Sequence, residues 1–103
     1  MDKKKILIID DDPKMLRAIK AMLDDRYQVS LATSGEQGVA FIPKKEPDII
    51  LLDYEMPGWD GAITLEKIRV LPGYQDIPVL FSSGRDDDGF MSELSHLNPA
   101  GFV

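Results

Sequence analysis

The sequence contains no cysteine among its 103 residues, which excludes disulfide bonds, thiolate zinc sites and cysteine nucleophiles. Long hydrophobic runs are missing as well, because no apolar stretch approaches the roughly 20 residues that a bilayer-spanning helix needs. The basic start at residues 1–5 is followed by an apolar segment that stops at Ile9, which is too short for a signal peptide. We therefore expect a cytoplasmic protein that makes no contact with a membrane.

Positive charge is also scarce. Lysine and arginine number 12 against 18 aspartates and glutamates, which gives a formal net charge of −6. Nucleic-acid phosphates are bound by clustered cations, so this balance argues against direct nucleic-acid binding. Neither G-x-G-x-x-G nor G-x-x-x-x-G-K occurs, which weakens a nucleotide-binding interpretation. The 44% hydrophobic and 29% charged residues are typical of a soluble globular protein, and the length suits one domain over residues 1–103.

Short apolar runs alternate with amphipathic segments along the chain. The expected strands are residues 6–9, 27–32, 49–52, 78–82 and the beginning of a fifth at 101–103. The expected helices are residues 13–23, 35–42, 61–71 and 90–97. This alternation predicts an α/β domain with right-handed crossovers and a parallel sheet that carries helices on both faces.

Several residues have the character of helix caps. Asp12 is followed by proline, an arrangement typical of a helix start, so we interpret Asp12 as a cap rather than a ligand. Ser34 and Gln37 have the spacing of a capping box, and Asp60 is placed to cap the third helix. Pro43 is expected to end the second helix.

Carboxylates follow two of the buried strands directly. Asp10 and Asp11 come after the first strand, and Asp53 comes after the third, where an open α/β sheet binds its ligands. If these strands are neighbours, the carboxylates converge and repel one another, so the cluster should hold a proton tightly when no metal is bound. A hard divalent cation such as Mg²⁺ would compensate the charge. Asp53 could then act as a nucleophile and become an acyl phosphate, and Ser83 could hydrogen-bond one of its phosphoryl oxygens.

Each of these residues also has a plainer interpretation. Asp10 and Asp11 could be solvated loop acids, and Ser83 alone is an ordinary loop serine. The lysines at residues 3–5 are interpreted as a solvated lead-in to the first strand.

Three segments together give the chain a specific resemblance. Residues 6–13, 53–61 and 77–84 resemble, in order and spacing, the receiver domain of two-component response regulators. The resemblance implies a flavodoxin-like, doubly wound parallel sheet with strand order 2-1-3-4-5. It implies that Asp53 accepts a phosphoryl group from a histidine kinase or phosphotransfer protein. It also implies that Asp10, Asp11, Asp53 and the backbone carbonyl of Glu55 hold Mg²⁺.

The resemblance further implies a two-state switch. Ser83 matches the switch hydroxyl and Phe102 the aromatic switch position, so phosphorylation would change a face that binds a downstream protein or output domain. Enzymatic activity would be limited to self-directed phosphotransfer and autodephosphorylation.

The family's fifth strand and fifth helix extend beyond the position of Val103. The chain is therefore expected to be truncated in the fifth strand and to lack the fifth helix. A lysine followed by proline, which couples the phosphoryl group to the switch, would also fall beyond this point. A chain of this length should phosphorylate poorly, and its bare apolar sheet face could support a dimer.

Two further functions remain as alternatives. The first is a receiver-like binding module whose state is set by a protein partner without phosphorylation. The second is a Mg²⁺-dependent aspartyl-phosphate phosphohydrolase resembling the haloacid dehalogenases, in which Asp10 and Asp12 form an Asp-x-Asp pair and Asp10 is labelled.

Overall fold

The computed structural model describes residues 3–81 and, for the backbone alone, residues 101–102. Its strands are β1 (Lys4–Ile9), β2 (Tyr27–Ala32), β3 (Ile49–Leu52), β4 (Val79–Phe81) and β5 (Gly101–Phe102). Its helices are α1 (Pro13–Leu23), α2 (Gly35–Lys45) and α3 (Gly61–Arg69). All strand pairs are parallel and the order is β2-β1-β3-β4-β5, so the predicted flavodoxin-like sheet order is confirmed. The fourth helix expected at residues 90–97 lies outside the described residues.

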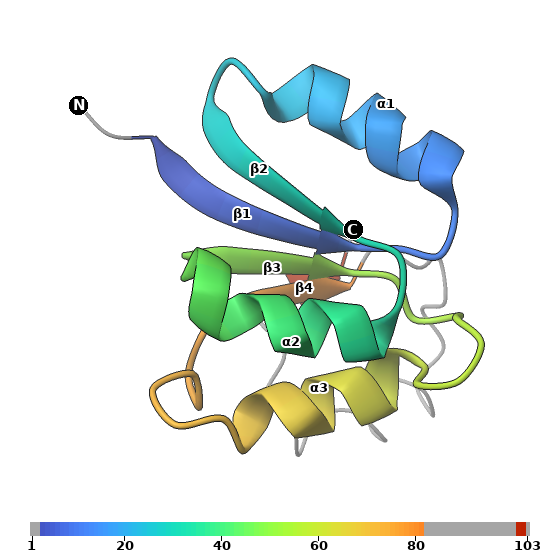
Figure 1. Ribbon diagram of the computed structural model, residues 1–103, viewed down its shortest axis with the longest axis vertical. Coiled ribbons are helices and arrows are strands. Elements are labelled where there is room, and N and C mark those ends of the chain that lie inside the picture. Colours follow the sequence, from blue (N-terminus) through green and yellow to red (C-terminus); the bar gives the residue numbers. More distant parts are fainter. Residues whose placement is uncertain (1–2, 82–100, 103) are drawn as a thin grey trace.

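The sheet separates two layers of helices. Helix α1 covers one face, while α2 and α3 lie side by side on the other (Figure 1). Alternate residues of β1 point to opposite faces, so Leu7 and Ile9 join the core under α2 and α3, whereas Ile6 and Ile8 pack with Leu16 of α1. Full burial of such side chains stabilises the fold by about 1.5–3 kcal/mol each. The continuous apolar run in β1 thus reflects burial on both faces.

The helix starts follow the predicted caps. The cap hydrogen bonds run from Lys14 N to Asp12 Oδ1 at 2.9 Å, from Gln37 N to Ser34 Oγ at 3.1 Å and from Ile63 N to Asp60 Oδ1 at 2.9 Å. The capping box is modified, because the Gln37 side chain accepts from the backbone N–H of Thr33 at 2.7 Å. Each cap stabilises its helix by about 0.5–2 kcal/mol.

The prediction that Pro43 ends the second helix was wrong. Helix α2 passes through Pro43 and ends at Lys45, and its C-cap residue Glu46 adopts a left-handed conformation with φ 49°. Pro43 is exposed in the last turn, so its missing N–H removes only one late intrahelical hydrogen bond. The Glu46 N–H still donates to the carbonyl of Ile42 at 2.8 Å, and the Ile42 side chain is fully buried. These contacts carry the helix two residues beyond the proline, to Lys45.

Helix α3 is shorter than expected, because it ends at Arg69 rather than at residue 71. Leu71 packs against the core from the turn that follows the helix, so its apolar character reflects burial outside helical geometry. None of the helices in the described part of the chain has the length and apolar character needed to cross a bilayer.

Candidate functional site

The register of β1 against β3 places two acids side by side. Ile9 pairs with Leu52, so the next residues, Asp10 and Asp53, leave neighbouring strands at the same edge of the sheet. The Asp53 N–H donates to the carbonyl of Ile9 at 2.9 Å, which continues the strand pairing up to the acid itself. The backbone therefore fixes the position from which each carboxylate projects.

Three carboxylates meet at this edge. One oxygen each from Asp10, Asp11 and Asp53 lies within 4.8 Å of the others, so the convergence expected from the sequence is present. Asp12 has another task, because its carboxylate caps α1 while its N–H donates to Asp10 Oδ1 at 2.9 Å. Asp12 thus acts as a helix cap, as predicted, and does not belong to the group of three converging carboxylates.

The cluster strongly disfavours a fully ionised state. The pKa of Asp53 is raised from 3.8 to about 6, mainly by burial and then by the negative charge of Asp10, against a hydrogen bond from the Glu55 N–H. Burial also raises the pKa of Asp10, which is 8% exposed, although the Asp12 N–H stabilises its ionised form. The site therefore retains a proton at a pH where a free aspartate has lost it.

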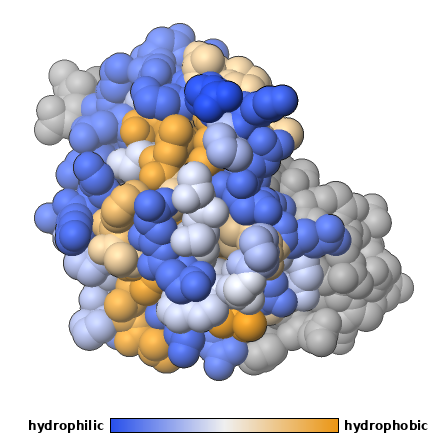
Figure 2. All heavy atoms as spheres, turned by 45° about the vertical axis from the view of Figure 1, so that its right-hand side comes forward, coloured by the Kyte–Doolittle hydropathy of each residue, from blue (hydrophilic) through white to orange (hydrophobic). Residues whose placement is uncertain are grey.

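The donor set fits a hard divalent cation. All the clustered groups offer carboxylate oxygens, and a cation between them would offset their mutual repulsion. Asp11 is exposed and Asp53 is half-buried, so a bound ion could keep water molecules in its coordination shell. The surface turned forward in Figure 2 is mostly hydrophilic, with smaller hydrophobic areas between the polar groups.

The loop between β3 and α3 is held down by close backbone contacts. The Gly61 N–H donates to the carbonyl of Tyr54 at 2.7 Å. A Cβ atom on Gly61 would lie 2.6 Å from Tyr54 Cα and 2.7 Å from Phe81 Cε1, so only glycine fits there. The Tyr54 and Phe81 rings pack edge to face with centroids 6.0 Å apart, and Met56 is buried in the core. These contacts restrict the loop that begins at Asp53.

Helix α2 supports the same loop from the side. Gly35 at the start of α2 approaches Trp59 and Thr64 so closely that a Cβ atom there would clash with the Thr64 hydroxyl. That hydroxyl donates to the Trp59 carbonyl at 3.5 Å, and Lys67 Nζ lies 5.4 Å from the Trp59 ring centroid. This support was not predicted from the sequence. Its only local signals were the small residues that open α2 and α3, Gly35 and Gly61.

Two predicted switch residues cannot be placed at the site. Ser83 lies outside the described residues. The backbone of Phe102 belongs to β5 and pairs with Phe81 of β4, while its side chain is outside the described part of the structure. The structure thus brings Asp10, Asp11 and Asp53 together, and the roles of Ser83 and Phe102 stay predictions.

Comparison with known proteins gives a consistent result. The family model for the response regulator receiver domain matches residues 6–103. A protein-glutamate methylesterase/protein-glutamine glutaminase of Trichodesmium erythraeum is 38% identical over 100 residues, covering 94% of this chain and 28% of that protein. The nitrate/nitrite response regulator protein NarL of Escherichia coli is 38% identical over 86 residues, covering 81% of this chain and 40% of that protein. The chain thus spans less than half the length of these relatives.

Solved structures show the same fold. The Vibrio cholerae chemotaxis protein CheY4 superimposes with a TM-score of 0.93 at 24% identity, covering 98% of this chain and 85% of that one. The N-terminal domain of a response regulator receiver protein from Methanoculleus marisnigri superimposes with a TM-score of 0.88 at 31% identity, covering 96% of this chain and 81% of that one. With the matching family model and the acid cluster at the strand ends, the chain belongs to the response regulator receiver domain family.

Proposed function

We propose that this receiver domain is a phospho-acceptor switch in which Asp53 takes a phosphoryl group from a histidine kinase or phosphotransfer protein. The observation that supports this most strongly is the meeting of Asp53 with Asp10 and Asp11 at the carboxyl ends of adjacent strands. In the transfer, an Asp53 carboxylate oxygen forms a bond to phosphorus. The bond between phosphorus and the donor's histidine nitrogen breaks, and the imidazole nitrogen keeps the electron pair.

Mg²⁺ is the cation that we assign to the cluster. The carboxylates of Asp10, Asp11 and Asp53 would hold it with the backbone carbonyl of Glu55. When bound, it neutralises charge on the acids and on the incoming phosphoryl group. Asp53 attacks only in its ionised form, so a bound cation that displaces the proton would extend the reaction to pH values below the raised pKa of about 6.

Phosphorylation of Asp53 would change the affinity of another face of the domain for its partner. We assign the switch hydroxyl to Ser83 and the aromatic switch to Phe102. The backbone of Phe102 is part of β5, which pairs with β4. The receiver would act in the cytoplasm on a downstream protein or on an output domain. Relatives several times longer than this chain are consistent with such an arrangement: the matched part is 19% of the Caulobacter response regulator PleD and 8% of the Escherichia coli histidine-protein kinase BarA. On this proposal, residues 1–103 are one receiver whose chemistry is confined to its own phosphorylation and dephosphorylation.

Chemical phosphorylation tests the assignment of the acceptor. The chain is incubated with phosphoramidate and Mg²⁺, and the added mass is located by intact mass measurement and peptide mapping. The decisive result is the position of the label rather than the rate at which it forms. We expect the label on Asp53, no label in Asp53→Asn, and normal labelling in Glu66→Gln, which removes an exposed acid on α3.

Two outcomes would contradict this proposal. A label on Asp10 that survives in Asp53→Asn would favour the phosphohydrolase chemistry. Equal partner affinity with and without the phosphoryl group, both in the unmodified chain and in Asp53→Ala, would favour a binding module that does not depend on phosphorylation.

A further inference from the structure

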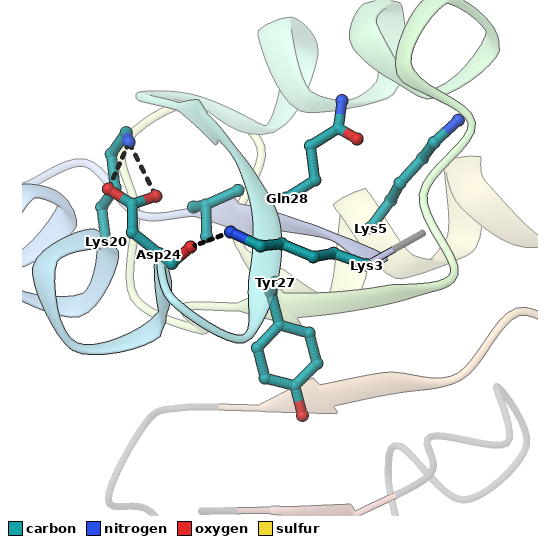
Figure 3. A pocket seen from close by; sticks show the side chains of 7 residues that line it. Lys3, Lys5, Lys20, Asp24, Tyr27 and Gln28 are labelled. Carbon is teal, nitrogen blue, oxygen red and sulfur yellow. Dashed lines mark hydrogen bonds and ion pairs between the residues drawn. The ribbon is translucent and has the colours of Figure 1, made fainter. Parts of the chain in front are cut away.

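We propose that the domain carries a second binding site, a basic pocket that takes small molecules bearing a chain of phosphate groups. The pocket is a hollow of about 660 Å³ at the edge where β1 and β2 begin (Figure 3). It is lined mainly by Lys3, Lys5, Lys20, Asp24, Tyr27 and Gln28. Its volume falls within the range of about 300–1,000 Å³ found for small-molecule sites.

The pocket has more positive charge than its own acid can neutralise. Lys20 Nζ binds both carboxylate oxygens of Asp24, at 2.8 and 2.7 Å. Lys3 Nζ instead donates to the Asp24 backbone carbonyl at 2.7 Å, and no acid among the described residues pairs with its charge. The nearby Asp48 carboxylate accepts the backbone N–H of Lys5 at 2.8 Å, and the Lys5 ammonium has no acid partner within the described residues. Two lysine charges are therefore available to an anion in a protein whose net charge is −6.

The arrangement of donors favours an extended anion. Lys5 and Gln28 are register partners on β1 and β2, and Figure 3 shows both side chains extending to the same side of the sheet. Lys3 and Lys20 converge on Asp24, while the Tyr27 ring extends the other way (Figure 3). A chain of phosphates could contact the lysines beside Asp24 and also the Lys5 and Gln28 side chains, which extend away from it (Figure 3). Lysine ammonium groups bind phosphate as point charges, without the planar fork of arginine.

The pocket is separate from the acid cluster. Lys5 lies near the start of β1 and Asp10 directly follows its end, so about 16 Å of extended strand lies between them. The acid cluster repels free anions, and in a metal-free buffer it offers them no binding site. Anion binding at the pocket can therefore be measured without interference from the cluster.

Titration with sodium tripolyphosphate in EDTA tests the proposal on the full chain. We expect saturable binding by calorimetry, with amide shifts in NMR spectra centred on Lys5, Gln28 and Val29. Lys5→Gln should weaken binding about fivefold, the effect of losing about 1 kcal/mol of charge-assisted hydrogen bonding. Gln28→Glu keeps every lysine but adds a negative charge, and it should weaken binding at least as much. Lys14→Gln, an exposed lysine at the other end of α1, makes the same charge change and should leave affinity unchanged within about twofold.

ATP, compared in the same buffer, distinguishes the possible sources of the phosphate chain. Affinity equal to that of tripolyphosphate would mean that the phosphate chain alone is recognised, and tighter binding would identify a nucleotide; both results support the site. The absence of saturable binding would overturn the proposal, as would an equal loss of affinity in Lys14→Gln and Lys5→Gln. A hexaglutamate peptide that binds as tightly as tripolyphosphate, with the same loss in Lys5→Gln, would refute the assignment to phosphate.

Discussion

Replacing Asp53 by asparagine should stabilise the metal-free domain at neutral and higher pH. The side chains have nearly the same shape, so the change mainly removes one negative charge from the cluster with Asp10 and Asp11. The folded protein holds the Asp53 proton with a pKa of about 6, above the ordinary value of 3.8. The native state therefore binds this proton more tightly than the unfolded chain, and wild-type stability falls as the pH rises through the interval between these values.

The size of the effect follows from the same shift. A rise of roughly two pKa units corresponds to about 3 kcal/mol between the protonation states. Asp53 is only half-buried and water screens part of the repulsion, so about 1–2 kcal/mol is the realistic expectation. At pH 8 in EDTA, Asp53→Asn should thus melt about 5–15 °C above the wild type. The two proteins should converge near pH 4, where both carry a neutral group at this position.

Urea and thermal unfolding from pH 4 to pH 8 in EDTA would measure this difference. Glu66→Gln is the matched control, because it removes one exposed negative charge from α3 and should show no gap that opens with pH. An Asp53→Asn variant no more stable than the wild type at pH 8 would refute the reasoning. It would mean that neither burial nor the neighbouring acids destabilise ionised Asp53 in the folded protein.

Two other substitutions test the packing around the site and the course of α2. Gly61→Ala should destabilise the domain by about 1–3 kcal/mol in urea unfolding, because the new methyl group meets Phe81 Cε1 at 2.7 Å; unchanged stability would contradict the close approach. Pro43→Ala should raise the free energy of unfolding by about 1 kcal/mol in the same assay, because α2 continues through this residue and alanine restores an intrahelical N–H; a loss of stability would show that the proline is needed there.

The sheet order was predicted from the resemblance to receiver domains, whereas the acids at the strand ends could be recognised from local patterns. Apolar runs that end in Asp10 and Asp53 mark the carboxyl ends of buried strands, and parallel connections bring such ends together. The course of α2 through Pro43 was not predictable, since it depends on the burial of Ile42 against the core. The support of the loop after Asp53 by Gly61 was missed, because contact between distant backbones leaves no periodic signal.

The basic pocket could not be predicted from the sequence either. A run of adjacent charges such as the lysines at residues 3–5 is typical of a solvated lead-in to a strand. Only the register of β1 against β2 brings Lys5 beside Gln28, and only the end of α1 brings Asp24 to Lys3. Neither contact follows from spacing along the chain.

The most direct test of the central claim is the melting temperature in MgCl₂ compared with NaCl of equal ionic strength. If Asp10, Asp11 and Asp53 hold one divalent cation, Mg²⁺ at about ten times its Kd should add about 1.4 kcal/mol at pH 8. That stabilisation should shrink at pH 5, where a proton competes for Asp53, and disappear in Asp10→Asn. A wild-type melting temperature unmoved by Mg²⁺, or moved equally in Asp10→Asn, would contradict the account.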